Sequence, residues 1–281
     1  MKLFKHIIIS FALLLLSILP FNSLQARTIV LVHGFMADDM SWRYSGFTQP
    51  LLQAGWKDGG GYGYGAQGML FPRDLMTKGD VFYTVNLPSK SNLQIQESYL
   101  MQYLSHLYAY RFEPMTLVGH SAGGLIARLY VIDPQREQAV NGLITIASPH
   151  LGTPAANIAH LAGNSPIGMM ASMAGISELQ DSRGLFSDLK EEAPYNFLYW
   201  MNRQHHPNIH YASIIRKNDS ITQPERFDFV VPPFSQDMNN IWALRERSGI
   251  ALSTENHSLN GKDGVILLQI LQHIPLSSSQ K

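Results

Sequence analysis

Met115-Thr-Leu-Val-Gly-His-Ser-Ala-Gly-Gly124 is the stretch of this 281-residue chain that decides its fold. Its first four residues form a short apolar run typical of a buried strand, and the apolar residues after Gly124 have the spacing of one helix face. Ser121 lies between the two, among glycines. A turn from strand to helix over so few residues is tight and strained, needs small neighbours, and projects its serine from the carboxyl edge of a sheet.

Similar apolar runs recur on both sides of this turn and predict strands at 28–32, 81–87, 143–147 and 210–215. Helical spacing over Leu93–Tyr108, with Asn92 as cap, and over Ala122–Ile132 places helices between them. This alternation predicts a mostly parallel sheet covered by helices on both faces. The glycine-dense residues 55–68 spell G-x-G-x-x-G without the flanking strand and helix that a dinucleotide site needs, so we expect a flexible surface loop there.

The chain resembles bacterial lipases and esterases of the α/β-hydrolase superfamily. The segments that carry the resemblance follow in family order: His33-Gly34, Gly119-His-Ser-Ala-Gly-Gly124, Ala147-Ser-Pro-His-Leu-Gly-Thr-Pro154, Asp228-Phe-Val-Val-Pro232 and Asn256-His257-Ser258. The resemblance implies the α/β-hydrolase fold, ester hydrolysis through an acyl-enzyme, and a mobile cap over the cleft. Some members hold a structural calcium with an aspartate shortly after the histidine, but Ser258-Leu-Asn-Gly261 follows here. We therefore predict no metal and no cofactor.

A serine hydroxyl attacks efficiently only when a base accepts its proton, and that base is usually a histidine held by a carboxylate. In α/β-hydrolases the order along the chain is serine, carboxylate, histidine. Of the 11 histidines, this order leaves two, and His257 in a loop suits the role of base better than His273 near the end of a helix predicted over 265–274.

Four of the carboxylates between the strand at 210–215 and His257 are candidates for the acid: Asp219, Glu225, Asp228 and Asp237. Asp228 begins Asp-Phe-Val-Val-Pro-Pro, an apolar turn that would let its side chain reach the histidine. Asp219 suits a turn at a strand end, and the other two suit solvated loops. The predicted catalytic residues are therefore Ser121, Asp228 and His257.

The negative oxygen that develops during acyl transfer needs backbone N–H donors that are already in place. Ala122 follows the nucleophile at a helix N-terminus and is the first predicted donor. Phe35 is the second, because it follows Gly34 in the loop that leaves the first strand.

Composition limits the partners and the compartment. Lysine plus arginine and aspartate plus glutamate both number 21, so no basic surface is available for nucleic acid. Residues 1–26 read as a secretory signal, with Lys2 and Lys5 before an apolar stretch and Ala26 before the cut, which predicts a periplasmic or secreted protein. The chain contains no cysteine and hence no disulfide.

Residues 155–205 interrupt the strand rhythm and are predicted to be a helical cap within one hydrolase domain, 27–281. Their apolar residues, Met169 and Met170 among them, suit transient contact with a lipid interface. We expect a carboxylester hydrolase acting on lipid or other apolar esters. The alternatives are an amidase or acyltransferase of the same fold and, from another class, a non-catalytic binding protein.

Overall fold

The strands of this computed structural model form one sheet, and the structure describes residues 26–154, 181–217 and 228–274. The strands are β1 (Thr28–Val32), β2 (Lys57–Gly65), β3 (Gly68–Leu70), β4 (Val81–Val85), β5 (Met115–His120), β6 (Val140–Ile146), β7 (His210–Arg216) and β8 (Ser248–Ser253). Their order in the sheet is β3-β2-β4-β1-β5-β6-β7-β8. Only the pair β2 and β3 is antiparallel within the described residues. The predicted mostly parallel sheet is confirmed.

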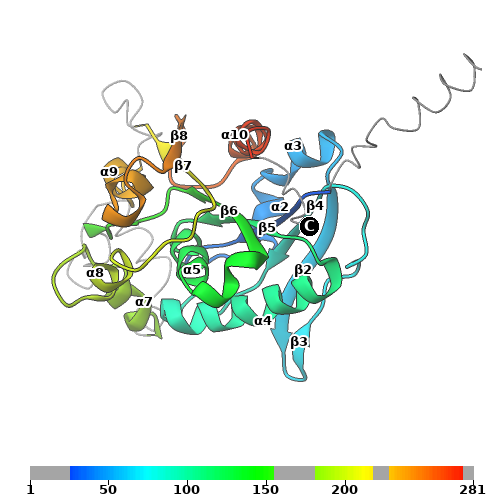
Figure 1. Cartoon of the computed structure of the whole chain (residues 1–281), viewed down its shortest axis with the longest axis horizontal. Helices are drawn as coiled ribbons and strands as arrows, with labels where there is room; N and C mark the ends of the chain where they lie inside the picture. Colours follow the sequence, from blue (N-terminus) through cyan, green and yellow to red (C-terminus); the bar gives the residue numbers. More distant parts are fainter. Residues whose placement is uncertain (1–25, 155–180, 218–227, 275–281) are drawn as a thin grey trace, which may run out of the picture.

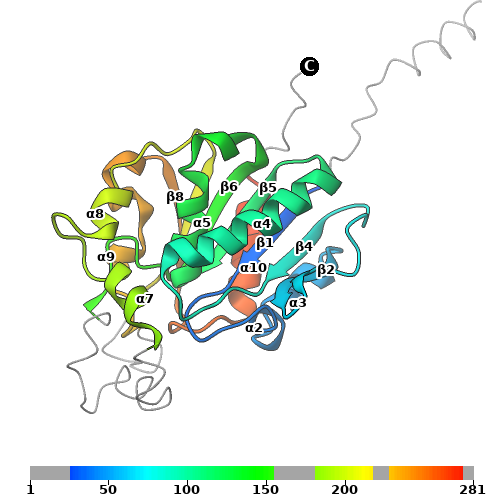
Figure 2. The ribbon, with the colours of Figure 1, turned by 90° about the horizontal axis from the view of Figure 1, so that it is seen from below.

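Helices cover both faces of the sheet. The α-helices are α2 (Ser41–Tyr44), α3 (Thr48–Gln53), α4 (Leu93–Arg111), α5 (Ala122–Val131), α7 (Arg183–Asp188), α8 (Phe197–Met201), α9 (Pro233–Gln236) and α10 (Gly261–Leu271). Three 3-10 helices, η1 (Pro134–Ala139), η4 (Met238–Asn240) and η5 (Trp242–Leu244), complete the described elements. In Figure 1, α4 and α5 lie below the sheet and α3 and α10 above it. Figure 2 shows α4 and α5 crossing the near face of the strands.

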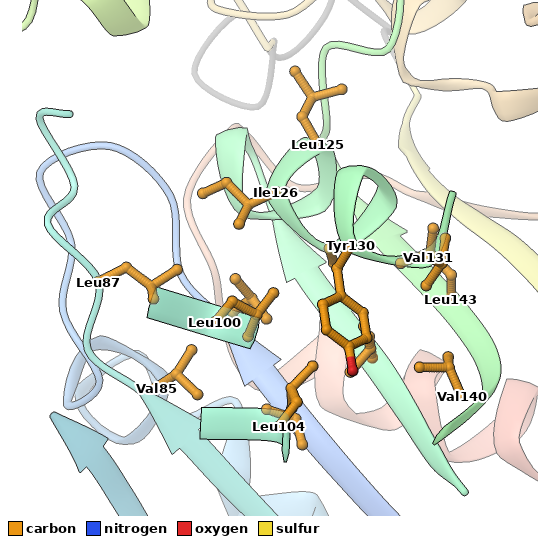
Figure 3. Packing of buried hydrophobic residues seen from close by; sticks show 14 of the residues in the cluster. Val85, Leu87, Leu100, Leu104, Leu125, Ile126, Tyr130, Val131, Val140 and Leu143 are labelled. Carbon is orange, nitrogen blue, oxygen red and sulfur yellow. The ribbon is translucent and has the colours of Figure 1, made fainter. Parts of the chain in front are cut away.

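Side chains that alternate along the central strands fill two cores. In β1, Val30 and Val32 pack into the core beneath α4 and α5, whereas Ile29 and Leu31 pack into the core beneath α3 and α10. Successive strand residues point to opposite faces, so a strand covered on both sides is apolar throughout. Figure 3 shows the first core, where residues of α4 and α5 meet β4 and β6. This packing explains why the central strands were evident in the sequence.

The direction of the connections changes at β1, and this change fixes the place of the site. The chain runs from β1 to β2 and β4 on one side, and then crosses to β5, β6, β7 and β8 on the other. In open α/β sheets, ligands bind at the carboxyl ends of the strands where the order reverses. The loops that follow β1 and β5 therefore meet at the expected binding edge, and they carry Phe35 and Ser121.

The flexible loop expected over residues 55–68 is wrong, because Lys57–Gly65 forms β2 and Gly68–Leu70 forms β3. Glycine is needed there because the ring of Tyr83 lies across the strand. A Cβ on Gly59 would stand 2.3 Å from that ring. Gly60 has a φ of +96° at a shift in the register with β4. The glycines thus permit close approach and a bulge in a paired strand.

The structure differs from the sequence predictions at β8, and it leaves parts of two predicted segments undescribed. The edge strand β8 was not predicted, because only one of its six residues is buried and it lacks a long apolar run. The predicted signal peptide falls in residues 1–25, outside the described part, as do residues 155–180 of the predicted cap. In the described part of the predicted cap, 181–205, the regular elements are the helices α7 and α8.

Among the described helices, none has the length and apolar character to span a membrane.

Candidate active site

Ser121 occupies a strained turn between β5 and α5. Its backbone has φ of 53° and ψ of −128°, a conformation that residues other than glycine rarely adopt. Its N–H donates to Ile146 O at 2.9 Å. The glycines around it are sterically required. A Cβ on Gly119 would lie 2.4 Å from Gly124 Cα, and one on Gly123 would lie 2.2 Å from Val32 O. The sequence therefore forces the serine outward at the carboxyl edge of the sheet.

The structure brings Ser121, His257 and Asp228 into one hydrogen-bonded row. His257 Nδ1 lies 2.9 Å from Asp228 Oδ2, and His257 Nε2 lies 3.0 Å from Ser121 Oγ. Since a carboxylate only accepts, Nδ1–H donates to Asp228, and Nε2 is left to accept the serine proton. The three predicted residues come from the ends of β5, β7 and β8, far apart in sequence.

Asp228 is almost fully buried and its carboxylate is well supplied with donors. Oδ1 accepts from the N–H groups of Val230 and Val231, each at 2.9 Å. Oδ2 accepts from Gln236 Nε2 at 3.0 Å in addition to His257. These bonds fix the direction in which the carboxylate meets the imidazole.

Of the alternative acids and base, the structure describes Asp237 and His273, and both lie away from Ser121. Asp219 and Glu225 fall outside the described residues. Asp237 accepts from Asn239 N–H at 2.8 Å, where it caps η4. His273 lies beyond the end of α10 with its ring bonded to Gln269 O. The described geometry therefore connects only the predicted pair to Ser121.

The two predicted oxyanion donors lie on segments that touch. Ala122 is the first residue of α5, so its N–H has no acceptor within the helix and carries the positive end of the helix dipole. Gly34 packs directly on the serine turn: a Cβ there would lie 2.9 Å from both His120 O and Ser121 Cβ, and 3.4 Å from Ala122 N. Phe35 follows Gly34 and thus borders the same space.

His33 holds the peptide that supplies the Phe35 N–H, a role the sequence did not reveal. Leu87 N–H donates to His33 Nε2 at 2.9 Å, which leaves Nδ1–H to donate to Gly34 O at 2.9 Å. In a trans peptide the carbonyl and the following N–H point in opposite directions. The hydrogen bond from His33 to Gly34 O therefore turns the Phe35 N–H away from the core. Burial lowers the pKa of His33, so the ring stays neutral.

His120, directly before Ser121, contacts His257. Its Nε2–H donates to the backbone carbonyl of His257 at 2.8 Å. Burial lowers the pKa of His120 well below its ordinary value, and the nearby His257 ring lowers it further. A neutral ring avoids placing a second positive charge beside the imidazolium that would form on His257 during reaction.

The described end of the predicted cap borders the oxyanion loop. The ring of Phe186 in α7 meets Phe35 edge to face, with centroids 5.2 Å apart. Leu93 N–H at the start of α4 donates to Asp188 Oδ2 at 2.9 Å. The contact between Phe35 and Phe186 therefore joins α7 to the loop that follows β1. Within residues 26–154, 181–217 and 228–274, no group of three or more histidine, aspartate or glutamate side chains is placed to hold a metal ion.

The fold resembles that of several solved structures at low sequence identity. The lin2722 gene product of Listeria innocua is 16% identical, with a TM-score of 0.62 over 90% of this chain and 97% of that one. The mature lipase BlEst2 of Bacillus licheniformis is 14% identical, with a TM-score of 0.60 over 89% and 92%. Lipase B of Aspergillus fumigatus is 14% identical, with a TM-score of 0.56 over 92% of this chain and 56% of that one.

Sequence comparison gives a narrower match. The family described as PGAP1-like alpha/beta domain matches residues 85–163, which include the serine turn. No match was found among curated protein sequences. Together the sheet, the turn and the structural matches define an α/β-hydrolase fold, which confirms the predicted fold class.

Proposed function

We propose that this protein is a carboxylester hydrolase that acts through an acyl-enzyme on Ser121. The observation that carries the proposal is the row of contacts from Ser121 Oγ to His257 Nε2 and from His257 Nδ1 to Asp228, at 3.0 and 2.9 Å. This arrangement suits removal of the serine proton during attack on a carbonyl.

The chemistry follows from the positions of these atoms. Ser121 Oγ attacks the ester carbonyl as His257 Nε2 takes its proton, and the buried carboxylate of Asp228 stabilises the imidazolium. Phe35 and Ala122 N–H groups would bind the oxygen that becomes negative. His257 then protonates the departing alcohol, and water attacks the acyl group by the same route to release the acid and free Ser121.

The substrate we propose is a lipid or another ester with an apolar acyl group. The aromatic pair Phe35 and Phe186 beside the oxyanion loop supports this choice. Phe229, which directly follows Asp228, is 44% exposed and adds apolar surface near the site. We also propose export after cleavage near Ala26, and contact of the cap with a lipid interface. N-terminal sequencing of protein recovered from the periplasm or the medium tests the export proposal.

Hydrolysis of p-nitrophenyl esters of increasing chain length, beside an emulsified triglyceride, tests the proposed reaction. We expect Ser121→Ala to lower turnover by several orders of magnitude, since the members of such a row act as a unit. The variant should remain folded, because the serine side chain lies at the edge of the core. A folded Ser121→Ala protein that keeps more than about a tenth of wild-type turnover would exclude this serine as the nucleophile.

A further inference from the structure

The loop that carries Asp228 is attached to one buried residue at the end of β7. The backbone N–H of Arg216 donates to Gln236 Oε1 at 2.8 Å. The amide nitrogen of Gln236 in turn donates to Asp228 Oδ2 at 3.0 Å and to Val231 O at 2.7 Å. Arg216, Gln236 and Asp228 are all buried. The acid is therefore held at a fixed distance from the last residue of β7.

The side chain of the same Arg216 is bonded to the loop that carries His257. Its two terminal nitrogens donate to the two carboxylate oxygens of Asp263 at 2.5 and 2.9 Å. Nη2 also donates to Ser258 O at 3.1 Å, one residue after the base. Nη1 donates to Ser253 Oγ at 2.9 Å, at the end of β8 where the loop begins. One guanidinium thus contacts both ends of this loop.

Asp263 fixes the C-terminal end of the loop that carries His257, where α10 begins. Its side chain accepts from the backbone N–H of Asn260 at 3.2 Å, while Asn260 Oδ1 accepts from Lys262 N–H, so the two residues form the capping box of α10. Arg216 and Asp263 are both fully buried at their side chains. The loop of the base is therefore held between a strand end and a helix start by a single ion pair.

A buried ion pair is a weak source of stability, because an apolar pair of similar volume often serves as well or better. An apolar pair, however, forms no oriented hydrogen bonds to its neighbours. Arginine is planar and presents its donors in a rigid fork, so it can hold several acceptors in one fixed arrangement. Here those acceptors lie beside the base, and the backbone of the arginine is joined to the acid.

We propose that Arg216 is a positioning residue that sets Asp228 and His257 in register with one another, acting through Gln236 on the acid and through Asp263 and Ser258 O on the base. This inference rests on the proposed function, because register matters only if the two residues act as acid and base. It assigns a role in turnover to an ion pair that does not touch the substrate.

Two variants of the full-length protein separate positioning from stability. In Arg216→Lys the positive charge beside Asp263 is kept, but a single ammonium replaces the fork. In the double variant Arg216→Met/Asp263→Leu the buried charges are removed together, so that no unpaired charge remains. The matched control is Arg111→Met/Glu113→Leu, which removes a partly buried pair with a 2.6 Å contact at the far end of α4. For each protein, kcat and KM for p-nitrophenyl butyrate and the thermal midpoint are measured.

We expect both Arg216 variants to lose at least about 30-fold in kcat with KM changed by less than about 3-fold, because a displaced base harms the reaction more than binding. The double variant loses one bond of the α10 capping box, so it should stay folded with a thermal midpoint within about 5 °C of wild type, and the control should keep its kcat. If either Arg216 variant is folded and retains kcat within about 3-fold of wild type, the pair is only structural and the proposal is overturned.

Failure of the proposed function has a different signature. If the wild-type protein hydrolyses no ester, the rate at which a fluorophosphonate labels Ser121 replaces kcat as the measure of nucleophile activation. Slower labelling in both folded Arg216 variants than in wild type then supports the positioning role. Equal labelling rates overturn it, and absence of labelling in the wild type overturns both proposals.

Discussion

Gly34→Ala should damage catalysis more than stability. The backbone of Gly34 is not in the left-handed region that disfavours alanine, so the effect of the substitution is steric. The new Cβ would lie 2.9 Å from both His120 O and Ser121 Cβ, whereas an ordinary contact begins at 3.4 Å. The oxyanion loop and the serine turn must therefore move apart by about half an ångström, since neither neighbour is a flexible side-chain end.

Two magnitudes follow from this displacement. Overpacking a well-packed site costs about 1–3 kcal/mol of unfolding free energy. Loss of one oxyanion donor costs about 100- to 1000-fold in kcat, and a partial displacement costs less, so we expect a fall of about 10- to 100-fold. KM should change little, because the interaction is strongest with the negative oxygen of the transition state.

The assay is kcat and KM for p-nitrophenyl butyrate together with urea unfolding. Gly249→Ala in β8 is the matched control, because its new Cβ would have its nearest contact at 3.7 Å, and it should behave as wild type. A stable Gly34→Ala protein with kcat within about 2-fold of wild type would refute the placement of the oxyanion loop against Ser121.

Two other predictions follow from the buried groups. Asp228→Asn should lower kcat by up to about 10⁴-fold, because the amide no longer favours the tautomer of His257 that can accept the serine proton. Asp237→Asn affects only the cap of η4, so its kcat should remain within about 2-fold of wild type. Steady-state kinetics that gave the reverse order would contradict the assignment of Asp228. Burial, with the nearby charge of Arg128, lowers the pKa of His206 to about 3. Between about pH 6.5 and 3 the unfolded chain therefore binds a proton that the folded chain does not, so stability falls as the pH falls, by about 2–3 kcal/mol at pH 4.5. His206→Phe should flatten the acid side of a plot of unfolding free energy against pH, and an unchanged slope would contradict the assignment.

The sequence predicted the elements whose pattern is local. The strands β1, β4, β5, β6 and β7 are covered on both faces and therefore appear as largely apolar runs. The start of α4 was predicted at Asn92, whose side chain indeed accepts from Ile95 N–H. The strands β2 and β8 have no such signal, because β2 is shaped by the ring of Tyr83 and β8 is an edge strand with a single buried residue.

The same distinction applies to the candidate site. Ser121 was evident because a tight turn imposes glycines within a few residues of it. The partners of the serine could be inferred from their order along the chain. The supporting residues Gln236, Arg216 and Asp263 could not, because their contacts join loops that only the folded sheet brings together. Nothing in their local sequence distinguishes a buried arginine from a solvated one.

The central claim is that Ser121 is a nucleophile activated by His257, and covalent labelling tests it most directly. The wild-type protein is incubated with a fluorophosphonate, and the labelled peptide is identified by mass spectrometry. Our account predicts one adduct, on Ser121, that forms far more slowly in a folded His257→Gln variant and is absent from Ser121→Ala. An adduct on another residue, or labelling of Ser121 at the same rate without His257, would contradict it.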